Sequence, residues 1–327
     1  MSLEVIKPGL LSSFQDLGRH GSQARGLPVC GAMDALSHRI ANLLVGNAPE
    51  EATLEITLTG PSLRFHQDCL IALAGADLSA TLQPARADTP QPLAPLRPVR
   101  VKTGTVLAFG RRHAGVRAYL ALAGGYGLAP ELGSCSTYLR GALGGWQGRA
   151  LQKGDRLPLP AAPRVPQPET DETANALLLG LLCGHAQAPV RFIQGPEWAV
   201  FNDASRQALV GSTYRIGAMS DRMGYRLEGP KLARSEPVEM LSEAVAFGTV
   251  QVPPDGQPIV LMADRQTTGG YPRIAQVAAV DLPVLAQRMP GDTVRFEPIA
   301  LEDAQRLLQR RAQALDQLDH ALNPFTR

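Results

Sequence analysis

The feature of this sequence that most restricts its fold is the shortness of its apolar runs, which end at glycine or proline. The chain has 327 residues, among them 32 glycines and 27 prolines, a content that suits many turns between short strands. Apolar runs bounded in this way are typical of β-strands. They cover residues 69–74, 116–123, 249–252 and 293–296. The sequence therefore predicts a mainly β fold with a few helices.

Two segments show helical spacing. Asp34 can cap a helix that ends at Gly46, and the tail over residues 301–322 repeats the same pattern. In the first helix the apolar residues on one face are Leu36, Ile40, Leu43 and Leu44. We expect both helices to pack against sheets.

A proline-rich stretch at residues 158–170, PLPAAPRVPQPET, predicts the boundary between two domains. It holds five prolines and almost no large apolar residue, so it favours an extended connector and cannot build a core. We predict a first β-barrel domain over residues 1–157, a linker over 158–170 and a second barrel over 171–300. A C-terminal helix and tail then cover 301–327.

The two halves also repeat short sequences. "GAMDALSHRI" at 31–40 is similar to "GAMSDRMGYRL" at 217–227, and "TGTVLAF" at 103–109 is similar to "PGDTVRF" at 290–296. A duplicated barrel would produce such repeats, and so would chance.

Composition excludes several classes of function. The 32 Lys and Arg residues nearly balance 30 Asp and Glu residues, which leaves a formal net charge of +2. This balance disfavours electrostatic capture of nucleic acid or of an anionic membrane. No apolar stretch reaches the length of a membrane span, and no secretory signal is recognisable. Four cysteines without a CxxC pair are typical of reduced thiols, so we expect a cytoplasmic protein.

Motifs for common chemistries are missing. The sequence has no GxxxxGK[ST], no HExxH and no GxSxG. Its six histidines are scattered singly, so we expect no metal site. No Met-Lys-Met occurs, and the chain is not expected to carry biotin itself.

Four polar, glycine-rich segments remain as candidates for a site. They cover residues 15–34, 132–149, 217–229 and 264–274. Each combines arginine with hydroxyl or amide groups, and arginine binds carboxylates in a bidentate manner while glycine lets backbone N–H groups approach an anion. This combination suits a small polar acid or amide. Turn formation and surface salt bridges explain any one segment equally well.

The same segments resemble those of a known family. "LGSCSTYLRGALGGWQGR", "SDRMGYRLEGP" and "DRQTTGGYPRIAQVAAVDLPVLAQRMPGDTVRF" are similar to the allophanate hydrolase subunit 2, or KipA-like, family, and the likeness runs from about residue 4 to about residue 298. The resemblance implies cyclophilin-like β-barrels, two of them in tandem.

The resemblance also implies an activity and partners. It indicates one component of a heteromeric, ATP-dependent 5-oxoprolinase, which opens 5-oxoproline to L-glutamate. The implied partners are a KipI-like, subunit-1-type chain (the B subunit) and a further chain (the A subunit), and ATP is bound by the complex. The substrate is a small polar acid or amide, with no nucleic acid or membrane as partner.

The matched motifs supply the candidate site residues. We predict Asp264 and Arg222 as catalytic residues, with Asp264 as the possible general base, although turn capping would also place an Asp there. Side chains expected to bind the substrate are Arg19, Asp34, Tyr225, Gln266, Thr267 and Tyr271.

Three other functions stay open. The chain can be a carboxyltransferase component that moves a carboxyl group from carboxybiotin to a urea-like nitrogen. It can also be a KipA-like regulator that binds a KipI-like kinase inhibitor, or a non-catalytic scaffold. All three would keep the same fold.

Overall fold

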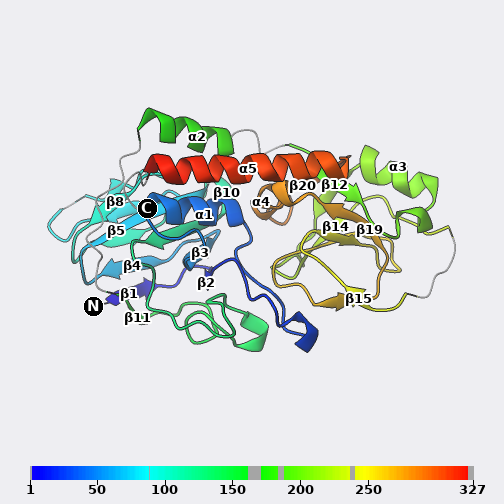
Figure 1. The fold of residues 1–327 in the computed structure, drawn as a ribbon. Coiled ribbons are helices and arrows are strands. Elements are labelled where there is room, and N and C mark those ends of the chain that lie inside the picture. Colours follow the sequence, from blue (N-terminus) through cyan, green and yellow to red (C-terminus); the bar gives the residue numbers. More distant parts are fainter. Residues whose placement is uncertain (1, 88, 161–170, 183–187, 236–239, 323–327) are drawn as a thin grey trace. The chain divides into compact units, whose positions relative to one another are not determined.

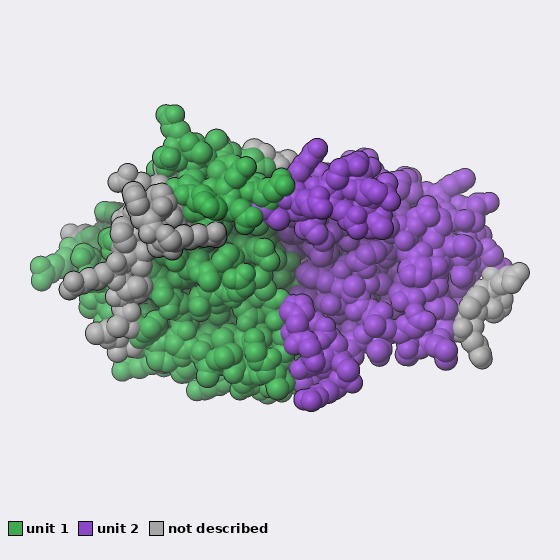
Figure 2. Space-filling view, in the orientation of Figure 1, with its two compact units in different colours: residues 1–19, 30–183, 313–327 green, residues 20–29, 184–312 purple. Residues whose placement is uncertain are grey.

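The computed structural model describes residues 2–87, 89–160, 171–182, 188–235 and 240–322. The chain forms two compact units, shown in different colours in Figure 2. Unit 1 comprises residues 1–19, 30–183 and 313–327, and unit 2 comprises residues 20–29 and 184–312. Each unit is therefore assembled from segments that are far apart in the sequence.

Unit 1 contains two open β-sheets (Figure 1). The order of the six-stranded sheet is β11 (Arg156–Pro158), β1 (Ser2–Lys7), β4 (Ser62–Phe65), β9 (Val106–Ala108), β6 (Thr81–Gln83) and β7 (Gln91–Pro92). The order of the five-stranded sheet is β2 (Leu11–Gln15), β3 (Thr53–Thr57), β10 (Ala114–Leu122), β5 (Cys69–Asp77) and β8 (Val99–Val101). Within both sheets the neighbouring strands are antiparallel.

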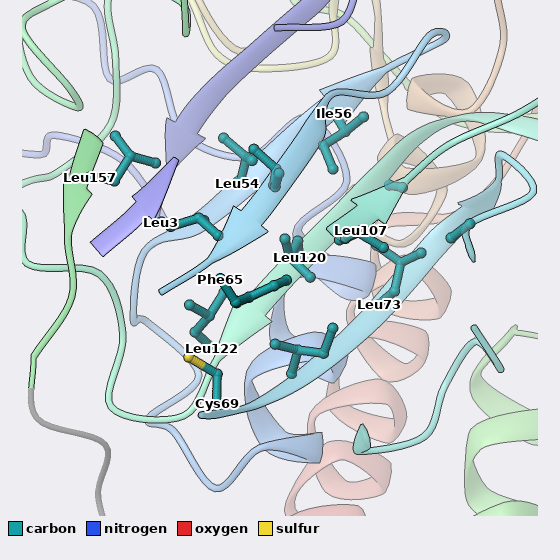
Figure 3. Close-up of a cluster of buried hydrophobic side chains, with 14 of the residues drawn as sticks. Leu3, Leu54, Ile56, Phe65, Cys69, Leu73, Leu107, Leu120, Leu122 and Leu157 are labelled. Carbon is teal, nitrogen blue, oxygen red and sulfur yellow. The ribbon is translucent and has the colours of Figure 1, made fainter. Parts of the chain in front are cut away.

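The main core of unit 1 draws apolar side chains from both sheets, as Figure 3 shows. Leu3 and Phe65 come from the six-stranded sheet, and Leu54, Ile56 and Leu120 come from the five-stranded sheet. Successive side chains of a strand point to opposite faces. On β3, Leu54 and Ile56 therefore enter this core, and Glu55 between them lies on the opposite face of the sheet.

Helices cover part of that opposite face. Helix α1 (Ala35–Leu44) packs its predicted apolar face, together with α2 (Glu172–Leu182) and the C-terminal part of α5 (Leu301–Leu322), in a second core with β5 and β10. Asp34 caps α1 by accepting a hydrogen bond from the Ser37 N–H at 2.9 Å. The two helices predicted from sequence are thus confirmed, whereas α2 was not predicted.

Unit 2 contains the one closed barrel among the described residues. Its strand order is β12 (Val190–Gln194), β19 (Arg273–Val277), β16 (Thr249–Gln251), β17 (Ile259–Leu261), β14 (Gly224–Glu228), β13 (Thr213–Ile216) and β20 (Thr293–Pro298). The parallel pairing of β12 with β20 closes the barrel. The Phe296 ring packs edge-on against the rings of Phe192 and Tyr214, with centroids 6.2 and 6.1 Å away.

Three smaller elements complete unit 2. Helices α3 (Asp203–Gly211) and α4 (Leu282–Ala286) were not predicted from the sequence. A two-stranded ladder joins β15 (Glu243–Ala244) to β18 (Thr268–Gly269) outside the barrel.

The two compact units of the structure differ from the two domains predicted from the sequence. Helix α2 follows the proline-rich stretch, yet its buried residues Ala174, Leu178 and Leu181 belong to the core of unit 1. Residues 161–170 of the predicted linker lie outside the described residues. We expected two barrels, and among the described residues one barrel is closed. The two sheets of unit 1 are open, with β11, β7, β2 and β8 as their edge strands.

The sequence repeats have unequal structural meaning. Residues 31–40 lead into α1 because Asp34 caps it, whereas residues 217–227 form a turn and β14 because Asp221 accepts hydrogen bonds from Met223 N and Gly224 N. The second repeat is a turn followed by a strand in both copies, β9 and β20. The first repeat therefore carries no shared structure.

Within the described part of the chain, Cys30, Cys69 and Cys135 form no disulfide bond, and Cys183 lies outside the described residues. Among the helices that the structure describes, none is both long enough and apolar enough to cross a membrane.

Replacing a core side chain tests the packing between the two sheets. We expect Leu120→Ala to lower the free energy of unfolding by about 2–5 kcal/mol, because the cavity would be only partly filled by relaxation. Leu10→Ala is the matched control, since Leu10 is 64% exposed. Equal urea-unfolding midpoints for the two variants would contradict the described core.

Candidate functional site

The first two polar segments meet in unit 1, where the Asp16 carboxylate organises the loop at residues 134–136. It accepts hydrogen bonds from Ser134 Oγ at 2.7 Å, from the Cys135 N–H at 2.6 Å and from Ser136 Oγ. The Gly18 N–H donates a further one. Burial raises the pKa of Asp16, but the hydrogen bonds outweigh this effect and hold it below the usual 3.8. Asp16 is therefore a stable anion at neutral pH.

The Arg19 guanidinium binds the backbone carbonyl groups of the same loop. Its Nε donates to Glu131 O at 2.9 Å, and its Nη2 donates to Ser136 O at 3.0 Å and to Ser134 O at 3.3 Å. The side chain is fully buried. The backbone of residues 134–136 thus lies between an anion that binds its donors and a cation that binds its acceptors. We call this arrangement the Asp16–Arg19 clamp.

The loop held by the clamp has an unusual backbone. Leu132, Ala142 and Gln147 have φ values between 49° and 56°, a region that side chains with a Cβ rarely adopt. A Cβ at Gly144 would lie 2.2 Å from Ser136 O and 2.6 Å from Arg19 Nη2. Only glycine fits there, so the loop's shape depends on the clamp and on glycine together.

The third and fourth polar segments meet in unit 2 through a buried ion pair. Arg222 donates from Nε to Asp264 Oδ2 at 2.9 Å and from Nη2 to Asp264 Oδ1 at 2.8 Å. Both side chains are less than a tenth exposed. Both carboxylate oxygens of Asp264 are therefore engaged by the arginine, and Asp264 could take a proton from a substrate only after this pair opened.

A second arginine fastens the rest of the segment 264–274. Arg273 forms a bidentate pair with Glu197, with contacts of 2.8 and 2.6 Å, and its Nη2 also donates to Glu243 on β15 at 2.6 Å. These carboxylates raise the pKa of Arg273 above its ordinary value, and the arginine lowers the pKa of Glu197. Arg273 thereby ties the β15–β18 ladder to the barrel.

The middle of this segment faces outward. Gln266, Thr268 and Tyr271 are exposed, and Thr267 is half-buried. The buried Gln251 on β16 lies beneath them, since Gln266 Nε2 donates to Gln251 Oε1 at 3.5 Å and Gln251 Nε2 donates to Tyr271 O at 3.4 Å. The ladder thus covers a buried side-chain amide.

The other predicted site residues have structural contacts. Asp34 caps α1, and its N–H donates to the Tyr119 hydroxyl, which in turn donates to Glu55. Tyr225 is buried and donates from its hydroxyl to Arg288 O at 3.1 Å. The structure brings Arg222 together with Asp264 and joins Gln266 to Tyr271 through Gln251. Arg19 and Asp34 lie in unit 1.

Sequence reasoning missed Asp16, Gln251 and Arg273 as key residues. Asp16 and Arg273 stand inside the polar segments, so their charge was a usable signal. Gln251 carried no such signal, because it lies in the run 249–252 that was interpreted as a strand and not in a polar segment.

The described residues hold no group of three or more His, Cys, Asp or Glu side chains arranged for a metal ion. His38 is buried, and burial lowers its pKa to about 4. Its Nδ1 contacts Thr53 Oγ1 at 2.8 Å, so His38 is a neutral structural residue.

Comparison with known proteins assigns this framework to a family. The family model "Carboxyltransferase domain, subdomain A and B" matches residues 25–298. The chain therefore belongs to this carboxyltransferase family, which confirms the resemblance found in the sequence. The structure of the K. lactis urea amidolyase superimposes with a TM-score of 0.88 at 31% identity, covering 97% of this chain and 20% of that chain.

Within the family, the chain is a full-length homologue of the C subunit of 5-oxoprolinase. It is 41% identical over 316 residues to that protein of Escherichia coli and 39% identical over 320 residues to that of Haemophilus influenzae. Each alignment covers 97% of both chains.

The ion pair in unit 2 gives a stability prediction. Asp264→Ala removes the carboxylate to which the buried Arg222 donates two hydrogen bonds, and we expect it to lower the free energy of unfolding by about 3–5 kcal/mol. Glu228→Ala breaks the exposed pair with Arg215 and should cost at most ~1 kcal/mol. Unchanged urea unfolding in Asp264→Ala, with activity lost, would instead favour a catalytic base that is free of Arg222.

The Asp16–Arg19 clamp gives a pH prediction. Because the folded state lowers the pKa of Asp16, the ionised carboxylate stabilises the fold above pH 3.8, and this contribution is lost as the pH falls further. We expect Asp16→Asn to cost about 1–3 kcal/mol at neutral pH. The difference from wild type should shrink below pH 3.8 in urea unfolding at stepped pH.

Asp255→Asn, a change at an exposed turn, controls for the loss of one negative charge. A difference between Asp16→Asn and wild type that stays constant down to strongly acidic pH would contradict the ionised clamp.

Proposed function

We propose that this chain acts as the C subunit of a cytoplasmic, heteromeric 5-oxoprolinase that uses ATP to open 5-oxoproline to L-glutamate. The observation that carries the proposal is the alignment with two proteins of that name over 97% of both chains. The A and B subunits of the enzyme are the partners that this name implies. The proposal also includes the cyclophilin-like type of the barrel.

The opening of 5-oxoproline fits a division of labour between this chain and its partner subunits. A lactam carbonyl is a poor electrophile, so ATP activates its oxygen before water attacks. The chain has no P-loop sequence, which is consistent with ATP being handled by a partner chain or by a different cradle. No biotin is attached to this chain in the proposed reaction.

This chain's share is to bind and orient the substrate. We place the substrate site at the loops of unit 2, where Arg222 and Asp264 hold the segment that presents Gln266, Thr267 and Tyr271. Arg222 and Asp264 act there by fixing the loop geometry. Arg19 and Asp34 serve the framework of unit 1, and Tyr225 serves the barrel.

One other activity has support. The family description and the TM-score of 0.88 with urea amidolyase favour carboxyl transfer from carboxybiotin to a urea-like nitrogen as the second candidate. It requires a biotin carboxylase and a biotin carrier as partners. The regulatory and scaffold functions stay predictions.

Reconstitution tests the proposed function. We expect the three purified subunits together to convert 5-oxoproline and ATP to glutamate and ADP, and omission of this chain to abolish glutamate. Arg222→Ala should lower kcat/KM by roughly 100-fold because the loop geometry is lost. Arg215→Ala is the matched control, since its exposed pair with Glu228 lies in the same unit.

Two results would count against the proposal. Glutamate formation by the other subunits without this chain would remove its role. A stable complex that carboxylates urea in the presence of a carboxybiotin carrier, and makes no glutamate, would select the second candidate.

A further inference from the structure

Three glutamines of unit 2 have very different hydrogen bonds. Gln276 accepts from Thr249 Oγ1 at 2.9 Å and donates to Phe247 O at 2.7 Å. Gln257 accepts from Gly229 N at 3.0 Å and donates to Gly229 O at 3.1 Å. Among the residues that the structure describes, Gln251 has only the contacts at 3.4 and 3.5 Å, which are long for N–H···O bonds. Its amide therefore has capacity for better partners.

Of these three glutamines, Gln251 is the most buried, at 1% exposure. Buried amides normally have good hydrogen bonds because an unmet donor or acceptor destabilises the fold. A polar group kept buried with poor partners requires an explanation, and a role in binding a ligand is one such explanation.

The β15–β18 ladder covers the Gln251 amide, and Gly269 is its residue in contact with the amide. A Cβ at Gly269 would lie 2.4 Å from Gln251 Nε2, so any larger residue at position 269 would require the Gln251 amide to shift. Gly269 belongs to the β15–β18 ladder, which consists of the two pairs Glu243↔Gly269 and Ala244↔Thr268. The ion pair of Glu243 with Arg273 also holds the ladder, but the Glu243 side chain is 56% exposed, so this pair adds little to its stability. Elements with so few backbone hydrogen bonds open at low free-energy cost.

We propose that Gln251 recognises the amide group of the substrate after this ladder lifts. A five-membered lactam holds its N–H and C=O side by side on one edge. A glutamine amide offers an acceptor and a donor with matching spacing, so the two groups can form a pair of hydrogen bonds. Gln257 makes the same type of double contact, to the N–H and C=O of Gly229.

The inference rests on the proposed function for its substrate, 5-oxoproline. Urea presents the same N–H and C=O edge, so the recognised chemistry is a planar amide edge shared by both molecules. Gln251 Nε2 would donate to the substrate carbonyl and Gln251 Oε1 would accept from the substrate N–H. The contacts to Tyr271 O and Gln266 Nε2 would be given up when the substrate binds.

The test measures binding separately from turnover. Equilibrium dialysis of labelled 5-oxoproline, and separately of labelled urea, would be carried out without ATP on the full-length chain and on the assembled complex. The variants are Gln251→Met, which keeps the side-chain length without the amide, and Gln257→Met as the matched control. Urea unfolding of each variant verifies that it is folded.

We expect Gln251→Met to weaken 5-oxoproline binding roughly 10- to 100-fold, the value of two neutral hydrogen bonds. In the active complex the KM should rise by a similar factor while kcat changes much less, because the contact is made in the ground state. Gln257→Met should leave both binding and KM unchanged.

The other outcomes separate this inference from the proposed function. Glutamate formation with an unchanged KM in Gln251→Met would overturn the inference and leave the function standing. Urea binding that depends on Gln251, in a complex without glutamate formation, would support amide recognition and overturn the function. Equal affinities of wild type and Gln251→Met for both ligands, or binding of neither ligand by wild type, would overturn the inference.

Discussion

A buried charge without water has to be solvated by the protein, and in unit 1 this requirement shapes the polar loop at residues 132–149. Arg19 is fully buried, and no carboxylate among the described residues lies within salt-bridge distance of it. Three backbone carbonyl groups take the place of water at its Nε and Nη2 atoms. Asp16 solves the same problem with hydroxyl and N–H donors from the same residues. The two charges together define one backbone path and make glycine at position 144 necessary.

Unit 2 uses the other solution, in which charge is paired with charge. Arg222 is matched by Asp264, and Arg273 by Glu197 and Glu243. Breaking the Arg222–Asp264 pair is costly because the buried charge that stays behind loses this partner. The pairs hold both ends of the segment 264–274 and leave its centre outward, over the poorly bonded amide of Gln251. Rigid ends and a thin cover are what a site needs in order to open and close again on a small ligand.

Much of the local structure could be predicted from the sequence. The strands at 69–74 and 293–296 and the helix capped by Asp34 follow from short-range patterns, and the structure has β5, β20 and α1 there. The four polar segments were also found. How they pair could not be read, because Arg19 contacts residues more than 110 positions away and no local pattern encodes such a contact.

The remaining differences have physical causes too. The stretch after the prolines was assigned to the second domain by sequence order, but the apolar face of α2 completes the core of unit 1. Asp264 has the residue type of a general base, but its carboxylate is bound by Arg222. Local sequence patterns do not show this contact, because Arg222 lies 42 residues earlier in the chain. In "DRQTTGGYPRI" the charged ends are structural, and the polar centre over Gln251 is the part that we assign to the substrate.

Buried charges set the shape of the polar loops before any ligand binds. Amide hydrogen exchange of the full chain, wild type beside Arg19→Lys, tests this most directly. Lysine keeps the charge but cannot reach three carbonyl groups with one planar fork. We expect residues 134–148 to lose protection together in the variant, while the barrel of unit 2 keeps its protection. Unchanged protection across that loop would show that its shape does not depend on Arg19 and would contradict the account.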